Sequence, residues 1–131
     1  MRTTEMLTAH PQAKGEPNPA LVRCIEDCLA CVQACACCAD ACLAEPDVRD
    51  QVRCIRLNLD CADICAATAA VLTRRTSGHA ELARSLLRTC AEACGACAQE
   101  CEKHAGRMEH CRICAEQCRA CEDACLTAPA P

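Results

Sequence analysis

Nineteen cysteines dominate the chemistry that this sequence can do. Most of them follow one another at steps of three or four residues, along four stretches of the chain. A thiolate is a nucleophile and a soft metal ligand, and in an oxidising compartment a thiol also forms disulfides. Which of these chemistries applies depends on where the folded chain places the thiols.

Steps of three and four residues match the period of an α-helix, so the cysteines of each stretch fall on one helix face. We call each such line a cysteine seam. The second seam is the sparsest, and Asn58 takes the place of a cysteine in it. Cys37 alone is off the seams, turned by about 140° from the seam of its own helix. The other eighteen cysteines lie on the seams: Cys24, Cys28, Cys31, Cys35, Cys38, Cys42, Cys54, Cys61, Cys65, Cys90, Cys94, Cys97, Cys101, Cys111, Cys114, Cys118, Cys121 and Cys125.

Four helices must carry these seams, and we predict them at about 19–44, 47–76, 78–105 and 107–126. Short connections between helices favour antiparallel neighbours. The fold class predicted is therefore all-α, an antiparallel up-down-up-down four-helix bundle with a cysteine-lined core. Residues 1–17 form a polar leader with a possible short helix over 4–10, and 127–131 form a tail.

The predicted boundaries rest on capping residues and helix breakers. A helix favours Asn at its N-cap, Pro at its first position and Gly just after its end. Breaks between helices are expected at turn-forming residues that interrupt the periodic pattern. These signals are Asn18-Pro19, Glu45-Pro46-Asp47 with Asp47 as a cap, Ser77-Gly78, and Gly106 as a C-terminal cap.

Composition limits the other classes of protein. The chain is 52% hydrophobic but contains no aromatic residue, so large side chains for an ordinary core are scarce. With a net charge of −4 and no basic stripe or stacking ring, a nucleic-acid partner is not expected. We recognise no signal peptide and no membrane span, and therefore expect a cytoplasmic protein. Thiols stay reduced there, and an odd number of cysteines cannot all pair within one chain.

Buried cysteines can serve as small hydrophobic residues or as a disulfide scaffold, but thiols on four facing seams favour a metal container. Zinc needs closed four-thiolate sites, each carrying negative charge into the core. The compact bacterial iron–sulfur motif is absent. Cu(I) is a soft monocation that thiolates select, and one ion per thiolate leaves the core neutral. We therefore predict multiple Cu(I) ions, roughly one per core cysteine.

The C-x3-C-x2-C-x3-C ladders between residues 18 and 126, without a signal peptide, resemble the cytosolic branch of the bacterial copper storage proteins, the Csp family. The resemblance implies Cu(I) storage or detoxification in the cytosol, with the seam cysteines as ligands. It also implies a homotetramer of four-helix bundles. We predict no enzymatic activity, since no nucleophile–base pair can be identified. A general buffer for Zn, Cd or Ag, and a metal-cluster enzyme or electron carrier, remain as alternatives.

The two ends of the bundle differ in chemistry. His104 extends the third seam beyond Cys101, and we predict it as a ligand where copper enters, with Asn58 and His110 as weaker candidates. The resemblance implies the same end, because cytosolic members of the family use histidine at the bundle mouth. At the other end we expect an aliphatic closure by Leu72, Ala83 and Leu86, with His79 near a helix cap.

Two of the helices carry a second apolar stripe outside the seam. These stripes serve either helix packing beside the core or contact between subunits. The sequence leaves both interpretations open. The stripes comprise Val22, Ile25, Leu29, Val32 and Ala36 on the first helix, and Val48, Val52, Ile55 and Leu59 on the second.

Overall fold

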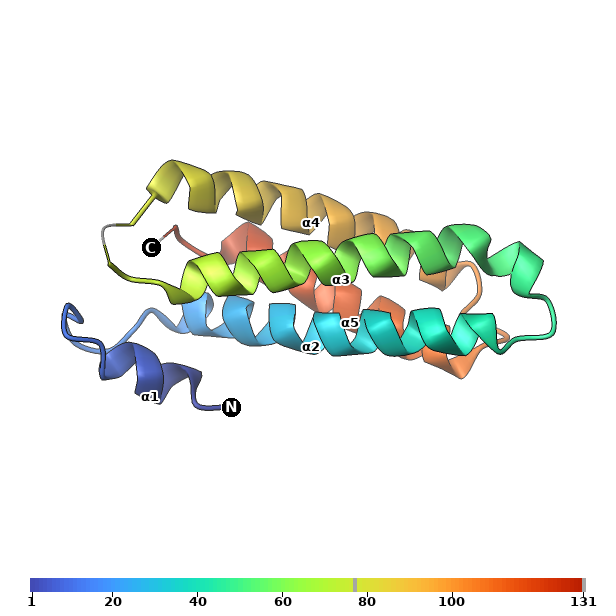
Figure 1. The fold of residues 1–131 in the computed structure, drawn as a ribbon, viewed down its shortest axis with the longest axis horizontal. Coiled ribbons are helices and arrows are strands. Elements are labelled where there is room, and N and C mark those ends of the chain that lie inside the picture. Colours follow the sequence, from blue (N-terminus) through green and yellow to red (C-terminus); the bar gives the residue numbers. More distant parts are fainter. Residues whose placement is uncertain (77, 131) are drawn as a thin grey trace.

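The computed structural model describes residues 1–76 and 78–130, which form helices and connecting turns. Four long helices make up the body: α2 (Pro19–Leu43), α3 (Val52–Thr73), α4 (Ala80–Glu102) and α5 (Glu109–Thr127). A short helix α1 (Thr3–Thr8) precedes them, and the 3-10 helix η1 (Val48–Gln51) leads into α3 (Figure 1).

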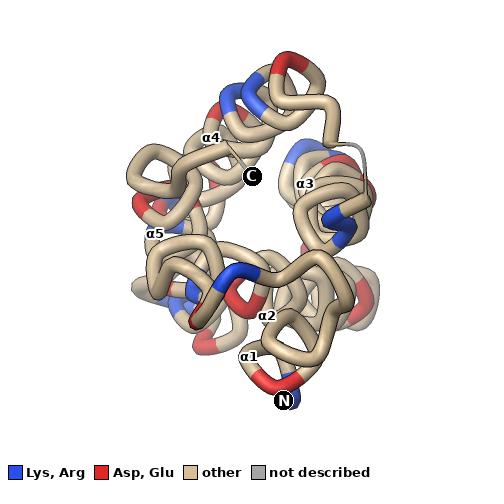
Figure 2. The backbone as a smooth tube through the Cα atoms, turned by 90° about the vertical axis from the view of Figure 1, so that its left-hand side faces the viewer, with Lys and Arg blue, Asp and Glu red and all other residues tan. Residues whose placement is uncertain are grey.

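The long helices form a square, antiparallel bundle. Contacts join α2 to α3 and α5, and α4 to α3 and α5, so each long helix has two main neighbours. Figure 1 shows successive long helices running back and forth along the long axis, and Figure 2 shows them arranged around a common centre. The predicted fold class is confirmed. Within the described residues, no helix is long and apolar enough to span a membrane.

The start of α2 follows the predicted capping signal. The Asn18 side chain accepts a hydrogen bond from the Ala20 backbone N–H at 2.8 Å, and Pro19 occupies the first helical position, where its missing N–H costs nothing. This arrangement fixes where the first cysteine seam begins.

Most other helix ends lie inside the predicted ranges, but α5 begins at Glu109 and ends at Thr127, one residue beyond the predicted end. The second predicted helix begins as η1 and ends at Thr73, because the following Arg74 has an extended backbone. The α4 helix begins at Ala80; Gly78 precedes it without regular structure, and Ser77 lies outside the described residues. The prediction that Gly106 caps this helix is wrong. The helix ends at Glu102, and the intervening turns place Gly106 in the connection to α5.

The N-terminal segment folds back onto the bundle. Leu7 of α1 is 4% exposed and belongs to the same apolar cluster as Leu21 and Ile25 of α2. His10 contacts the Thr76 hydroxyl through Nε2 at 3.3 Å. The leader therefore covers the outer side of α2 near the α3–α4 connection (Figure 1). His104 follows α4 at the other end of the bundle.

Candidate metal centre

The four seams meet at the centre of the bundle. All eighteen seam cysteines are buried, with exposed fractions between 0% and 4%. Cys37 is exposed, in agreement with its predicted position off the seam. All nineteen thiols are free. Since Cys and Ala make up most of the buried residues, sulfur atoms occupy the space that leucine side chains fill in an ordinary bundle.

The sulfur atoms form a nearly continuous column along the bundle axis. Within one helix, the Sγ atoms of Cys31 and Cys35 are 3.7 Å apart. Contacts between helices are as short, and Cys118 Sγ of α5 lies 3.7 Å from Cys31 Sγ and 3.6 Å from Cys35 Sγ. On the other side of the column, Cys65 Sγ is 3.6 Å from Cys94 Sγ. A metal ion in this column would thus be held between helices as well as along them.

The thiols group into overlapping sets of four, and within each set the sulfur atoms all lie within 4.8 Å of one another. Four cysteines (Cys31, Cys35, Cys118 and Cys121) each belong to two sets. A sulfur shared between two sets suits a ligand that bridges two metal ions, as in a thiolate cluster. Five such sets are Cys28–Cys90–Cys121–Cys125, Cys31–Cys65–Cys94–Cys121, Cys31–Cys35–Cys61–Cys118, Cys35–Cys97–Cys114–Cys118 and Cys38–Cys42–Cys54–Cys111.

Neighbouring thiols also change one another's acidity. The hydrogen bond between Cys24 and Cys125 lowers the pKa of Cys24 to about 4, and a hydrogen bond with Cys125 also lowers the pKa of Cys121 to about 7. Burial raises the pKa of Cys42, where desolvation of the thiolate dominates. A column of this kind contains thiols that lose their protons readily beside others that keep them, so a soft cation has thiolates to bind at neutral pH.

Asn58 crosses the column within the seam of α3. Its Oδ1 accepts hydrogen bonds from the thiols of Cys97 and Cys114 at 3.2 and 3.0 Å. Its Nδ2 donates to the Cys54 backbone carbonyl at 2.9 Å, and the side chain is fully buried. The amide oxygen therefore already faces two thiols, a position from which it could also contact a metal ion.

One end of the column, which we call the mouth, is formed where α2 and α4 end and α3 and α5 begin. His104 follows α4 there and is 9% exposed. Its Nε2 donates to Glu100 Oε2 at 3.1 Å, while its Nδ1 is buried without a hydrogen-bond partner. We predict His104 at this end of the bundle from the sequence, and His104 lies there in the structure.

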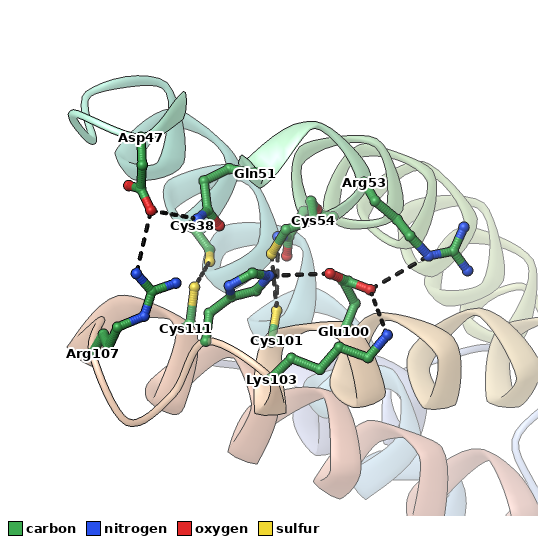
Figure 3. Close-up of polar contacts among 12 residues, drawn as sticks. Cys38, Asp47, Gln51, Arg53, Cys54, Glu100, Cys101, Lys103, Arg107 and Cys111 are labelled. Carbon is green, nitrogen blue, oxygen red and sulfur yellow. Dashed lines mark hydrogen bonds and ion pairs between the residues drawn. The ribbon is translucent and has the colours of Figure 1, made fainter. Parts of the chain in front are cut away.

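Glu100 is the acidic centre of the mouth. The carboxylate is 7% exposed and contacts Arg53 Nε at 3.4 Å and Lys103 Nζ at 3.3 Å, besides His104 (Figure 3). Burial would raise the pKa of Glu100, but hydrogen bonds from His104 and Lys103 outweigh it and hold the pKa below its ordinary value. The side chain is therefore an anion that accepts hydrogen bonds.

His110 lies on the other side of the mouth, in the first turn of α5. Its Nδ1 is 3.4 Å from Cys38 Sγ and 3.6 Å from Cys111 Sγ. Its Nε2 contacts Glu45 Oε1 at 3.0 Å. The structure thus brings a second predicted histidine directly against two seam thiols.

A polar bridge spans the outer edge of the mouth. Asp47 Oδ2 accepts from Gln51 Nε2 at 3.5 Å and from Arg107 at 3.4 Å (Figure 3). Gln51 is fully buried and its Oε1 has no hydrogen-bond partner, and Met108 in the connection before α5 is 5% exposed. Asp47 precedes η1 but makes no side-chain hydrogen bond as its cap. The residue predicted as a helix cap instead ties two connections together.

The opposite end of the column is aliphatic, as expected, with one correction. Leu72 and Ala83 are buried, but Leu87 (5% exposed) occupies the place predicted for Leu86. Counting back from Cys90 and Cys94 by alternating steps of three and four reaches position 87, so Leu86 points to the side of the seam. His79 is the exposed N-cap residue of α4 and lies outside the column.

Several residues of the column escaped the sequence analysis. Thr68 continues the α3 seam and is fully buried, with its hydroxyl donating to the Ile64 carbonyl. Gln51 and Met108 lie three residues before Cys54 and Cys111, so extending the seams by one step would have found them. Glu45 had no such signal, because its role depends on which residue the turns bring opposite it. Glu100 lies four residues before His104, so helical spacing would have found this pair.

Comparison with known proteins decides the family. The family model for copper storage proteins (Csp) matches residues 18–130, which is nearly the whole chain. This chain belongs to the copper storage protein family. Among curated protein sequences, none matches it significantly.

Solved structures agree with this assignment. The copper storage protein Ccsp from Streptomyces lividans, loaded with 10 copper equivalents, is 53% identical, with a TM-score of 0.91 and 95% of each chain covered. A second structure from Streptomyces lividans, described as a cytosolic copper storage protein carrying five coppers, is 59% identical, with a TM-score of 0.81 and 82% of this chain and 89% of that chain covered. The Cu(I)-bound storage protein BsCsp3 is 36% identical, with a TM-score of 0.71, over 82% of this chain and 95% of that chain.

Proposed function

We propose that this chain stores Cu(I) in its core, with the eighteen seam thiolates as ligands and a capacity of roughly one ion per core cysteine. The observation that carries the proposal is the nearly continuous column of buried, free thiols, in which several sets of four share cysteines. The Streptomyces lividans relative loaded with 10 copper equivalents supports a capacity of many ions.

Overlap is the reason to favour Cu(I) over zinc. If each set of four held its own Zn²⁺ ion, the shared sulfurs of Cys31, Cys35, Cys118 and Cys121 would have to serve two closed tetrahedra. Each isolated site would also carry net negative charge into a core whose buried positions include no Lys or Arg among the described residues. Monovalent copper bridged by thiolates keeps the charge per sulfur close to zero.

A second candidate function, a buffer for zinc or another soft metal, is supported by the distances themselves. A tetrahedral zinc site with Zn–S bonds of about 2.3 Å has sulfur atoms about 3.8 Å apart. The sulfur contacts of the column, for example 3.6 Å between Cys65 and Cys90 and 3.9 Å between Cys28 and Cys90, include this value. Zinc binding to one or a few separate sets is thus sterically feasible.

We place the route for copper at the mouth, with His104 as a ligand and with Asn58 and His110 as additional ones. His104 supports this role because its Nδ1 is buried and unpaired, and His110 because its Nδ1 already contacts two thiols. Asn58 presents its amide oxygen to Cys97 and Cys114. Each of the three therefore has a donor atom that could bind an ion, His104 and His110 at the mouth and Asn58 one helical turn beyond Cys54.

The setting that we propose for this function is cytoplasmic, non-enzymatic and oligomeric. A related protein from Streptomyces lividans is described as cytosolic, and free thiols need a reducing compartment. Storage needs ligands and a shielded core but no reacting group. The homotetramer implied by the family resemblance would bury the exposed members of the apolar stripes, Leu29 on α2 and Val52 and Leu59 on α3, whereas Ile25 is already buried within the single chain.

Anaerobic titration of the reduced full chain with Cu(I), and in parallel with Zn²⁺, tests the function. We expect tight binding of Cu(I) up to a number approaching the number of core cysteines, with displacement of thiol protons into the solvent. Zinc should saturate at far fewer ions, and Cu(I) should displace it. Saturation with only a few Cu(I) ions would exclude storage, and zinc that resists an excess of Cu(I) would favour the buffer.

A further inference from the structure

Both histidines of the mouth contact the carboxylate of a glutamate in the same way. His104 contacts Glu100 through Nε2 at 3.1 Å, and His110 contacts Glu45 through Nε2 at 3.0 Å. The two carboxylates come from different parts of the fold, one from α4 and one from the connection after α2. Two independent histidines that each offer the same nitrogen to a glutamate indicate a common role.

A carboxylate can only accept a hydrogen bond, so the proton of each neutral imidazole must lie on Nε2. The opposite nitrogen, Nδ1, then has a free lone pair. In His110 that lone pair lies beside the sulfurs of Cys38 and Cys111, at 3.4 and 3.6 Å. In His104 the corresponding atom is buried and has no hydrogen-bond partner, a state that costs free energy unless something binds there.

Glu100 is itself held in place. Arg53 and Lys103 contact its Oε1, which leaves Oε2 for His104. The carboxylate therefore cannot turn away without breaking ion pairs to α3 and to the end of α4. This arrangement resembles the carboxylate–histidine pairs that orient imidazole ligands and raise their basicity in metal sites.

We propose that Glu100 and Glu45 are positioning residues of the copper mouth, which fix His104 and His110 as Nε2–H tautomers and direct each Nδ1 toward the thiol column. The inference rests on the proposed function and adds how the mouth is prepared before an ion arrives. Neither glutamate touches the metal, and each acts through its histidine.

The direct readout is the tautomer of each histidine in the reduced, metal-free chain, measured from long-range ¹H–¹⁵N correlations of the imidazole rings. In the wild-type protein we expect the Nε2–H form for His104 and His110. Glu100→Ala should disturb this preference in His104 alone, and Glu45→Ala in His110 alone. His10 and His79 lie outside the mouth and provide internal references. A tautomer that is unchanged in both variants would overturn the proposal.

The functional readout is the rate at which the chain takes up Cu(I) from a buffered Cu(I)–chelator complex. Glu100→Ala should slow uptake about tenfold, as loss of such outer partners does in metal sites, without lowering the number of ions bound at saturation. Glu92→Ala, on an exposed position of the same helix, is the matched control and should load at the wild-type rate.

A double variant separates positioning from a general effect on the bundle. Because Glu100 acts through the imidazole, His104→Ala combined with Glu100→Ala should load no more slowly than His104→Ala alone. If Glu100→Ala slowed uptake in the His104→Ala variant as much as it does in the wild-type chain, the proposal would be overturned. If Glu100→Ala does not fold, the Glu45→Ala and His110→Ala pair carries the same test. Failure of the storage function would look different, because the wild-type chain itself would then saturate with few ions.

Discussion

A cysteine on a bundle seam takes the place of a leucine but offers a donor atom where leucine offers two methyl groups. The substitution leaves the core with less apolar volume, and here the smaller side chains bring sulfur atoms within 3.6 to 4.0 Å of one another. Position on the helix decides what a cysteine can do. Cys94 points into the column, and Cys37, on the outer side of α2, faces solvent.

Single serine substitutions test this division. Cys94 Sγ lies 3.7 Å from Cys61 Sγ and 3.6 Å from Cys65 Sγ, so Cys94→Ser should reduce the number of Cu(I) ions bound at saturation by about one, because a bridging thiolate is lost. Cys37→Ser should leave the capacity unchanged. Anaerobic Cu(I) titration of both variants measures the difference, and an equal loss in the two would contradict the assignment of ligands to the seams.

At the mouth, His104→Ala should slow Cu(I) uptake while leaving the final capacity close to that of the wild type. The reason is that one nitrogen ligand is lost near the surface, whereas the eighteen seam thiols remain. Stopped-flow uptake from a Cu(I)–chelator complex gives the rate, and equilibrium titration gives the capacity. The exposed His79→Ala variant is the control, and wild-type kinetics in His104→Ala would remove this residue from the loading route.

Among the elements, the seams were predictable because a helix repeats and a turn does not. Alternating steps of three and four residues place Cys24 and Cys125 on facing lines whatever the details of the loops, and the same periodicity gave the fold class. Ends of helices depend on local backbone geometry, and Arg74 leaves the helix although no Pro or Gly precedes it. For that reason the seams were located correctly while several boundaries were displaced by two or three residues.

The polar mouth was only half predictable. His104 and His110 could be recognised from their distance to the nearest cysteine. Glu100 lies four residues before His104, a helical spacing that the sequence also contains. Glu45 could not be recognised, since 65 residues separate it from His110 and only the packing of α2 against α5 brings them together. Gln51 and Thr68 continue the seam pattern, but a polar residue in a cysteine-rich line gives no indication of burial by its type.

Between elements, an ion pair ties α4 to α5 and gives a pH-dependent contribution to stability. Arg119 contacts both carboxylate oxygens of Glu102 at 2.8 and 3.1 Å, and its hydrogen bonds lower the pKa of Glu102. A lowered carboxyl pKa in the folded state stabilises the fold above the ordinary pKa of glutamate. The contribution disappears as the pH falls through the lowered value.

We therefore expect Glu102→Gln to lower the free energy of unfolding of the reduced apoprotein by about 0.5 kcal/mol at pH 7, a small value because both side chains are nearly half-exposed. The difference from wild type should shrink at pH 3, below the ordinary pKa of glutamate, because protonation of the carboxyl removes the charge that Arg119 stabilises. Urea denaturation at the two pH values measures it, and a difference that persists unchanged at pH 3 would show that the ion pair is not its source.

On the scale of the whole molecule, the outer face of α3 exposes a group of aliphatic side chains. Val52 is 65% exposed and Leu59 48% exposed, on the predicted stripe with the partly buried Ile55. Arg53 and Arg56 flank them on the same helix. Exposed aliphatic side chains rimmed by charge are typical of contacts between subunits.

If this face joins subunits, replacing Val52 with Glu should shift the reduced apoprotein toward a monomer of 14.0 kDa, because a charge would be buried in the contact. Light scattering coupled to size-exclusion chromatography gives the mass. Leu126→Glu, on a 70% exposed position of α5, is the matched control and should leave the assembly intact. An assembly that survives Val52→Glu and dissociates with Leu126→Glu would place the contact on α5 instead.

The side chains of Leu72, Ala83 and Leu87 at the aliphatic end offer no donor atom to an ion that would leave there. If ions enter and leave only at the mouth, as proposed, the ion that is bound last is the first to be released. Cells that load and unload the protein in part would exchange only the upper layers. The oldest copper would stay at the bottom, and successive loading with two copper isotopes would reveal this order.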